Sequence, residues 1–190
     1  MAADRESRVP SRTNPKMKTP FLAIIIGMTA MVRGCKTTTV APVIATTGNK
    51  LSRGARVYIA TPADGIYGTQ VYEGSGSQVM SALRAAFIPN AGEVSVGGRA
   101  DLASDAIRAA KQNNCRYAVI PRITQWEDHA TEWSGKRDKL ELSLRVLRVD
   151  NGAEISTTAI SGKSSWVTFG GDHPQNLLRG PIEQTVGALY

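Results

Sequence analysis

The sequence predicts an α/β fold of the mixed α+β kind, in which a β-α-β-α unit is followed by an antiparallel hairpin and a C-terminal helix. We expect one small domain over residues 55–190. Short β-branched stretches alternate with amphipathic stretches in its first half. A strictly alternating stretch then runs into Asn151-Gly152, and apolar residues recur at helical spacing before the C-terminus. A segment of this length can bury a core without disulfide bonds.

The first half begins with a strand and a helix. Residues 56–60 are β-branched and aromatic, and the turn residues 61–65 end the predicted strand. Ser75 or Ser77 is expected to cap a helix that ends at Phe87, because apolar residues recur four apart in between.

A second strand and helix follow. Residues 93–96 predict a short strand, and Asp101 is expected to cap a helix that ends at Asn113. The nearly continuous apolar run 115–120 is typical of a central strand covered on both faces. Pro121 fits such a strand only near an edge or a bulge.

The best-defined local pattern is the later hairpin. Asp150-Asn151-Gly152 predicts its turn, and residues 153–165 are expected to return beside the alternating strand. A C-terminal helix is expected next, with Pro181 at a kink or at its start. The apolar positions of this strand and helix are Leu140, Leu142, Leu144 and Val146, then Leu178, Ile182, Val186 and Leu189.

The N-terminal segment is typical of an export signal, a signal peptide over residues 1–34. Lys16 and Lys18 precede an apolar run over residues 21–32, which is too short to span a bilayer but suits a secretory leader. Met17 is a plausible true start, so residues 1–16 need not be translated.

Cys35 closes this leader after the small residue Gly34, as in the lipobox of bacterial lipoproteins. We expect its thiol to carry acyl chains such as palmitate and residues 35–54 to form a flexible tether. Lys36 then implies transfer to the outer membrane, with the domain on the periplasmic side. Arg33 departs from the lipobox pattern, which leaves an uncleaved anchor or a secreted protein with a free thiol as alternatives.

The charge of the chain argues against nucleic acid as its partner. The net charge is +7, but six basic and two acidic residues precede Cys35, which leaves 17 basic and 14 acidic residues and a charge of +3. Cys115, the second of the two cysteines, is expected to be a small buried apolar residue.

Two stretches carry a resemblance to known proteins. Residues 60–76, and residues 126–135 with Trp126-Glu127 and Thr131-Glu132-Trp133-Ser134-Gly135, resemble a family of short lipoproteins of unknown function in Gram-negative bacteria. The order of elements is distantly similar to periplasmic domains of the penicillin-binding-protein activator lipoprotein and the curli secretion lipoprotein, and to the amino-terminal domain of the Tol-system translocation protein. The resemblance implies a domain that acts by contacting partners.

We therefore expect an outer-membrane lipoprotein with a binding or scaffolding role in the cell envelope, and neither a cofactor nor a metal. The candidate binding surface comprises Tyr67, Tyr72, Trp126 and Trp133, whose amphipathic rings suit a protein or a sugar ring. The same tryptophans could instead belong to the core.

Two alternatives remain open. One is a hydrolase of an envelope polymer that uses Asp128, His129 and Glu132, which requires the three side chains to converge in a pocket. Strand alternation places Glu127 and His129 on the face opposite Asp128, which argues against one shared metal site. The other alternative is a soluble periplasmic protein with a closed apolar pocket for a ligand.

Overall fold

A computed structural model describes residues 43–46, 50–99, 102–128, 138–163 and 177–190. The chain divides into two units, residues 1–34 and 35–190, and every described residue belongs to the second. The predicted leader and Cys35 lie outside the described residues. Among the helices that the structure describes, none has the length and apolar composition needed to cross a membrane.

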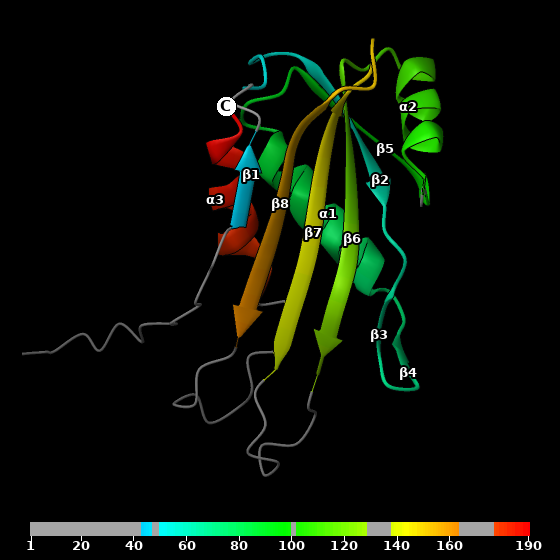
Figure 1. The fold of residues 1–190 in the computed structure, drawn as a ribbon, viewed down its shortest axis with the longest axis vertical. Helices are drawn as coiled ribbons and strands as arrows, with labels where there is room; N and C mark the ends of the chain where they lie inside the picture. The colour runs from blue at the N-terminus through cyan, green and yellow to red at the C-terminus, as the bar shows by residue number, and fades with distance from the viewer. Residues whose placement is uncertain (1–42, 47–49, 100–101, 129–137, 164–176) are drawn as a thin grey trace, which may run out of the picture. The chain divides into compact units, whose positions relative to one another are not determined.

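One mixed sheet organises the described residues (Figure 1). The central strand β6 pairs in parallel with β2 and antiparallel with β7, as its nearly continuous apolar sequence predicts. The strand β2 also pairs in parallel with β5, and β7, β8 and β1 continue the sheet antiparallel. The order is β1 (Val43–Thr46), β8 (Glu154–Lys163), β7 (Lys139–Arg148), β6 (Tyr117–Glu127), β2 (Arg56–Thr61) and β5 (Glu93–Arg99).

Helices cover both faces of this sheet. The helices α1 (Ser75–Phe87) and α3 (Arg179–Ala188) pack on one face, and α2 (Ala103–Gln112) packs on the other (Figure 1). The core under α1 and α3 is built from bulky side chains, among them Leu83, Phe87 and Trp126. The core under α2 includes small ones such as Ala106 and Ala110. The predicted α+β class is confirmed.

The predicted hairpin forms between β7 and β8, but its turn differs from the expected one. Two positive φ angles are expected for Asn151-Gly152, yet only Gly152 has one, at 70°. The Gly152 N–H donates to the carbonyl of Arg148 at 2.9 Å, and Asn151 Oδ1 accepts from the Ala153 N–H at 3.0 Å. The loop is therefore longer than a two-residue turn, and only its last residue needs the freedom of glycine.

The helix ends also differ in detail from the prediction. Helix α1 begins at Ser75, but neither serine caps it, because the N-cap position is Gly74 with a φ of 83°. Asp101 lies outside the described residues, and the N-cap of α2 is Leu102. Val119 is the last β6 residue that pairs with β2, and Pro121 lies beyond it. The N–H that proline lacks is therefore not needed for pairing with β2.

Parts of the segment predicted as a tether contact the domain. The strand β1 pairs with β8, Leu51 is 3% exposed, and its N–H donates to the carbonyl of Leu189 at 2.8 Å. The Ser52 N–H donates to the Tyr117 hydroxyl at 3.1 Å. These contacts join residues just before the domain to both its sheet and its C-terminal helix.

Candidate binding site at the β3–β4 hairpin

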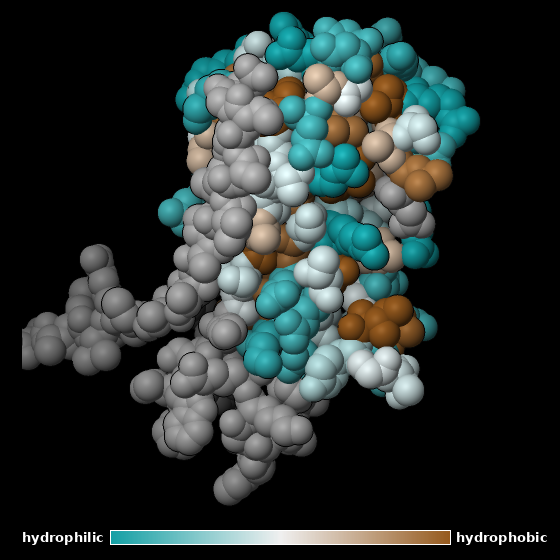
Figure 2. Space-filling model, viewed as in Figure 1, coloured by the Kyte–Doolittle hydropathy of each residue, from teal (hydrophilic) through white to brown (hydrophobic). Residues whose placement is uncertain are grey.

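A small hairpin follows β2 and presents apolar side chains to solvent. It consists of β3 (Gly65–Tyr67) and β4 (Gln70–Tyr72), and Gly68 in its turn has a φ of 59°. Ile66 is 60% exposed, Val71 46% and Tyr67 43%. Figure 2 shows an apolar patch at this end of the described surface. We call these three side chains the hairpin tip.

The base of the hairpin is fixed to the start of α1. The Gly65 N–H donates to Ser75 Oγ at 2.8 Å, and Asp64 Oδ1 accepts from the Gly76 N–H at 2.8 Å. A carboxylate at this helix terminus also interacts favourably with the helix dipole. Asp64 therefore satisfies a backbone donor that Ser75 and Ser77 were expected to serve, and it determines where the hairpin leaves the domain.

The hairpin lies directly against β6. A Cβ atom on Gly65 would approach Trp126 Cβ to 2.5 Å and Ile123 Cγ2 to 3.1 Å, so only glycine fits there. The Tyr72 hydroxyl donates to the carbonyl of Asp128 and accepts from its N–H, both at 3.3 Å. Residues from both hairpin strands are thus held against one stretch of β6.

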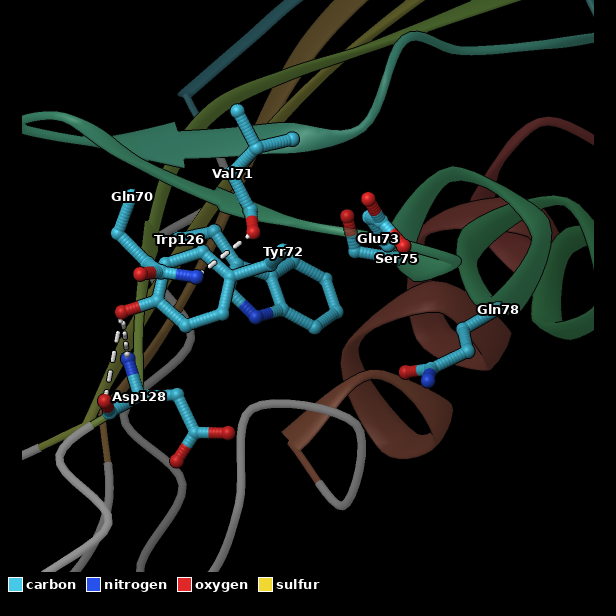
Figure 3. A pocket seen from close by; sticks show the side chains of 8 residues that line it. All are labelled: Gln70, Val71, Tyr72, Glu73, Ser75, Gln78, Trp126 and Asp128. Carbon is cyan, nitrogen blue, oxygen red and sulfur yellow. Dashed lines mark hydrogen bonds between the residues drawn. The ribbon is translucent and has the colours of Figure 1, made fainter.

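A polar pocket of about 490 Å³ opens where the hairpin, α1 and the end of β6 meet (Figure 3). Its volume lies within the range of small-ligand sites. No lysine, arginine or histidine among the described residues lines it. The lining residues are Gln70, Val71, Tyr72, Glu73, Ser75, Gln78, Trp126 and Asp128.

Trp126 combines burial with an unused donor. The residue is 2% exposed, and its indole N–H has no hydrogen-bond partner among the residues that the structure describes. Figure 3 shows the indole nitrogen on the ring edge that is turned toward the side of the site where Asp128 and Gln78 lie. Because the ring borders the pocket, this donor is available to an acceptor that enters the pocket.

Glu127 lies beside this pocket without lining it. It is 4% exposed, its carboxylate accepts from Gln125 Nε2, and Lys139 Nζ lies 3.4 Å from Oε1. Asp128, the next residue, lines the pocket as Trp126 does. Alternation along β6 therefore separates the two acidic residues, as the sequence predicts.

The structure brings together some of the predicted site residues. Tyr72 and Trp126 line the pocket, and Tyr67 lies on the hairpin tip. Trp133 lies outside the described residues, as do His129 and Glu132, so the hydrolase alternative stays a prediction. No group of three metal-ligating side chains occurs in the part of the chain that the structure describes. The pocket is open and polar, unlike the closed apolar one that a soluble ligand binder would favour.

Sequence reasoning missed Asp64, Glu73 and the two glutamines of the pocket. Gln70 lies on a strand of three residues, too short for alternation to show, and Gln78 lies one position before the apolar stripe of α1. The sequence did contain a signal for Gln78. It is a polar residue in the first turn of α1, next to the buried Val79, and it therefore lies close to the loop that precedes the helix.

Comparisons with known proteins come from sequence and from structure. A family model described as "Domain of unknown function (DUF4823)" matches residues 49–189. No curated protein sequence matches the chain. Among solved structures, the chain is similar to the PelC dodecamer from Paraburkholderia phytofirmans, with 16% identity and a TM-score of 0.62 over 80% of this chain and 96% of that one.

Two further solved structures resemble the chain. A dodecamer of a variant of the same PelC, in a second crystal form, gives a TM-score of 0.61 at 16% identity, over 80% of this chain and 98% of that one. The LpoB C-terminal domain from Salmonella enterica gives 0.35 at 11% identity, over 61% of this chain and 86% of that one, which is too low to support an argument. The similarity to PelC establishes a shared fold.

Proposed function

The chain belongs to this family of unknown function, and we propose that it is an outer-membrane lipoprotein whose periplasmic domain binds and scaffolds other molecules of the cell envelope. The lipid anchor rests on the sequence around Cys35. Burial of acyl chains contributes about 0.8 kcal/mol per CH₂, so two or more chains hold a protein firmly on a membrane.

The observation that carries the binding role is the hairpin end of the domain. A rigidly attached hairpin exposes Ile66, Tyr67 and Val71 together, beside a pocket whose buried Trp126 has an unused donor. Exposed apolar side chains gathered on one element are typical of contact surfaces, whereas scattered ones need no explanation.

We propose that the partner at the hairpin tip is a second copy of the chain. PelC, which shares the fold, forms a dodecamer. A tip that inserts into a different surface of the next copy makes a head-to-tail contact, and such contacts close into rings when the rotation allows it. Self-assembly on a membrane would provide a scaffold.

The anchor is tested by the intact mass of the protein purified from membranes of cells that express it from Met1. The proposal predicts the mass of residues 35–190 plus acyl chains, and loss of both acyl mass and membrane association in Cys35→Ser. An unmodified full-length mass would contradict it.

Self-assembly is tested by native mass spectrometry of the full chain in detergent. We expect oligomers in the wild type and monomers in the Ile66→Asp/Val71→Asp variant, because two desolvated charges oppose the contact. Leu102→Asp is the matched control, since Leu102 is also exposed, at 62%, but lies before α2. A monomeric wild type, or equal effects of the two variants, would refute the role of the tip.

A further inference from the structure

From the pocket at the base of the hairpin we infer a ligand: the pocket lined by Tyr72, Trp126 and Gln78 binds a neutral oligosaccharide. The inference rests on the proposed binding role and names the class of molecule that the site takes. It concerns the pocket, which shares only Val71 with the hairpin tip.

The pocket offers one hydrogen-bond donor to a ligand. The indole N–H of Trp126 has no partner among the described residues, and its ring edge faces the open pocket (Figure 3). Indole nitrogen donates and never accepts, so the ligand must offer an oxygen there. Because Trp126 is 2% exposed, the rest of the ring is closed off, and the acceptor must enter through the pocket.

The second step is the demand for donors. The carboxylate of Glu73 lines the same space, together with the amides of Gln70 and Gln78, which both donate and accept. A carboxylate accepts hydrogen bonds and cannot donate them when ionised. The ligand must therefore carry donors close to its acceptor, and a hydroxyl group supplies both on one atom.

The third step excludes other ligands. An anionic ligand would meet the carboxylate of Glu73 without a basic residue among the described lining, which disfavours phosphates and uronic acids. Besides Trp126, six of the eight lining residues have polar side chains. An apolar ligand would desolvate these polar groups without bonding them, which is unfavourable. A polyhydroxylated ring satisfies the polar groups and can lie against the half-buried ring of Tyr72.

The pocket is also held in place before a ligand arrives. Tyr72 is bonded to the backbone of Asp128, and Ser75 is bonded to the backbone of Gly65. Both contacts join the hairpin to an element on the other side of the pocket. A preformed site loses little conformational entropy on binding, which suits ligands that make only hydrogen bonds and stacking contacts.

The test is isothermal titration calorimetry of the full chain in a detergent without a sugar headgroup. The probes are chitotetraose and cellotetraose, with tetragalacturonic acid as the anionic comparison. We expect saturable binding of at least one neutral probe and at least tenfold weaker binding of the acid. Failure of both neutral probes, or equal binding of the acid, would overturn the inference.

Two variants locate the site. Trp126→Phe keeps an aromatic ring but removes the N–H and should weaken binding about tenfold. Gln78→Ala, at an exposed position, should weaken it about threefold without risk to folding, and Gln112→Ala on α2 is the matched control with no change. Unchanged affinity in both pocket variants would overturn the inference. Because membrane association and oligomer mass do not involve Trp126, they test the proposed function separately.

Discussion

Two corners of the domain each hold an aromatic side chain whose polar atom bonds no described residue, and they differ in what surrounds that atom. At the hairpin, the Trp126 N–H faces an open pocket. At the C-terminus, the Tyr190 hydroxyl is buried without a partner among the described residues. Its ring meets Phe87 edge to face, with centroids 6.3 Å apart, and Arg53 lies 5.9 Å from its centroid.

The difference separates a binding end from a structural end. An unpaired atom that borders a pocket can bond a ligand, and that bond contributes to affinity. An unpaired atom enclosed by protein is a permanent cost that only the packing around it offsets. Substitutions at the two corners should therefore affect different properties.

The largest expected effect is at Gly65. Gly65→Ala forces a Cβ atom against Trp126 and should lower the free energy of unfolding by about 1–3 kcal/mol. It should also displace the hairpin and abolish oligosaccharide binding. Chemical denaturation measures the first effect, with Gly98→Ala as the control because no atom lies within 4 Å of a Cβ there. Equal stabilities of the two variants would show that the close approach to Trp126 does not exist.

A smaller effect of opposite sign is expected at Tyr190. Tyr190→Phe removes a buried hydroxyl that has no partner among the described residues, so the free energy of unfolding should stay equal or rise by about 1 kcal/mol at neutral pH. Oligosaccharide binding should not change. The Trp126→Phe variant provides the contrast, since it should lose binding. A large loss of stability in Tyr190→Phe would mean that the hydroxyl has a partner.

Alkaline titration sharpens the same comparison. Burial, and then proximity to Tyr117, raise the pKa of Tyr190 from 10.0 to about 12. Between pH 10 and pH 12 the hydroxyl of Tyr190 keeps its proton in the folded state but has lost it in the unfolded state. The contribution of Tyr190 to the free energy of unfolding is therefore fully present below pH 10 and is lost as the pH rises to about 12. The stability of the wild type should fall more steeply over this window than that of Tyr190→Phe. Parallel curves would contradict the raised pKa.

The smallest expected effect lies in α3. Gly187 is exposed, and no atom lies within 4 Å of a Cβ placed on it. Gly187→Ala should therefore raise the free energy of unfolding by about 0.5–1 kcal/mol, because alanine loses less backbone entropy in a helix. The thermal midpoint of unfolding measures this gain. No change, or a loss, would show that the described helix does not persist at this residue.

The long elements were predictable because their sequence patterns repeat. Apolar and polar residues alternate from Leu140 to Val146, and the strand there has one buried face. Val79, Leu83 and Phe87 recur at helical spacing, and all three are buried in α1. Cys115 is buried, as expected of a small apolar residue, and burial raises the pKa of its thiol.

The site was less predictable because it depends on contacts distant in sequence. The hairpin strands have three residues each, too few for a period to appear. Asp64 bonds the backbone of Gly76 twelve residues later, and Gly65 is required by Trp126 on another strand. Tyr72 and Trp126 were proposed from residue type alone, and only the fold shows that they line one pocket.

The most direct test of the binding end is the indole signal of Trp126 in a nitrogen-15 NMR spectrum of the full chain. The Trp126→Phe spectrum identifies that signal among those of the three tryptophans. On titration with chitotetraose or cellotetraose, we expect this signal to move saturably, while the amide signals of Leu189 and Tyr190 stay in place. An indole signal that stays fixed with both probes, or that moves together with those C-terminal amides, would show that the pocket at Trp126 does not bind these sugars.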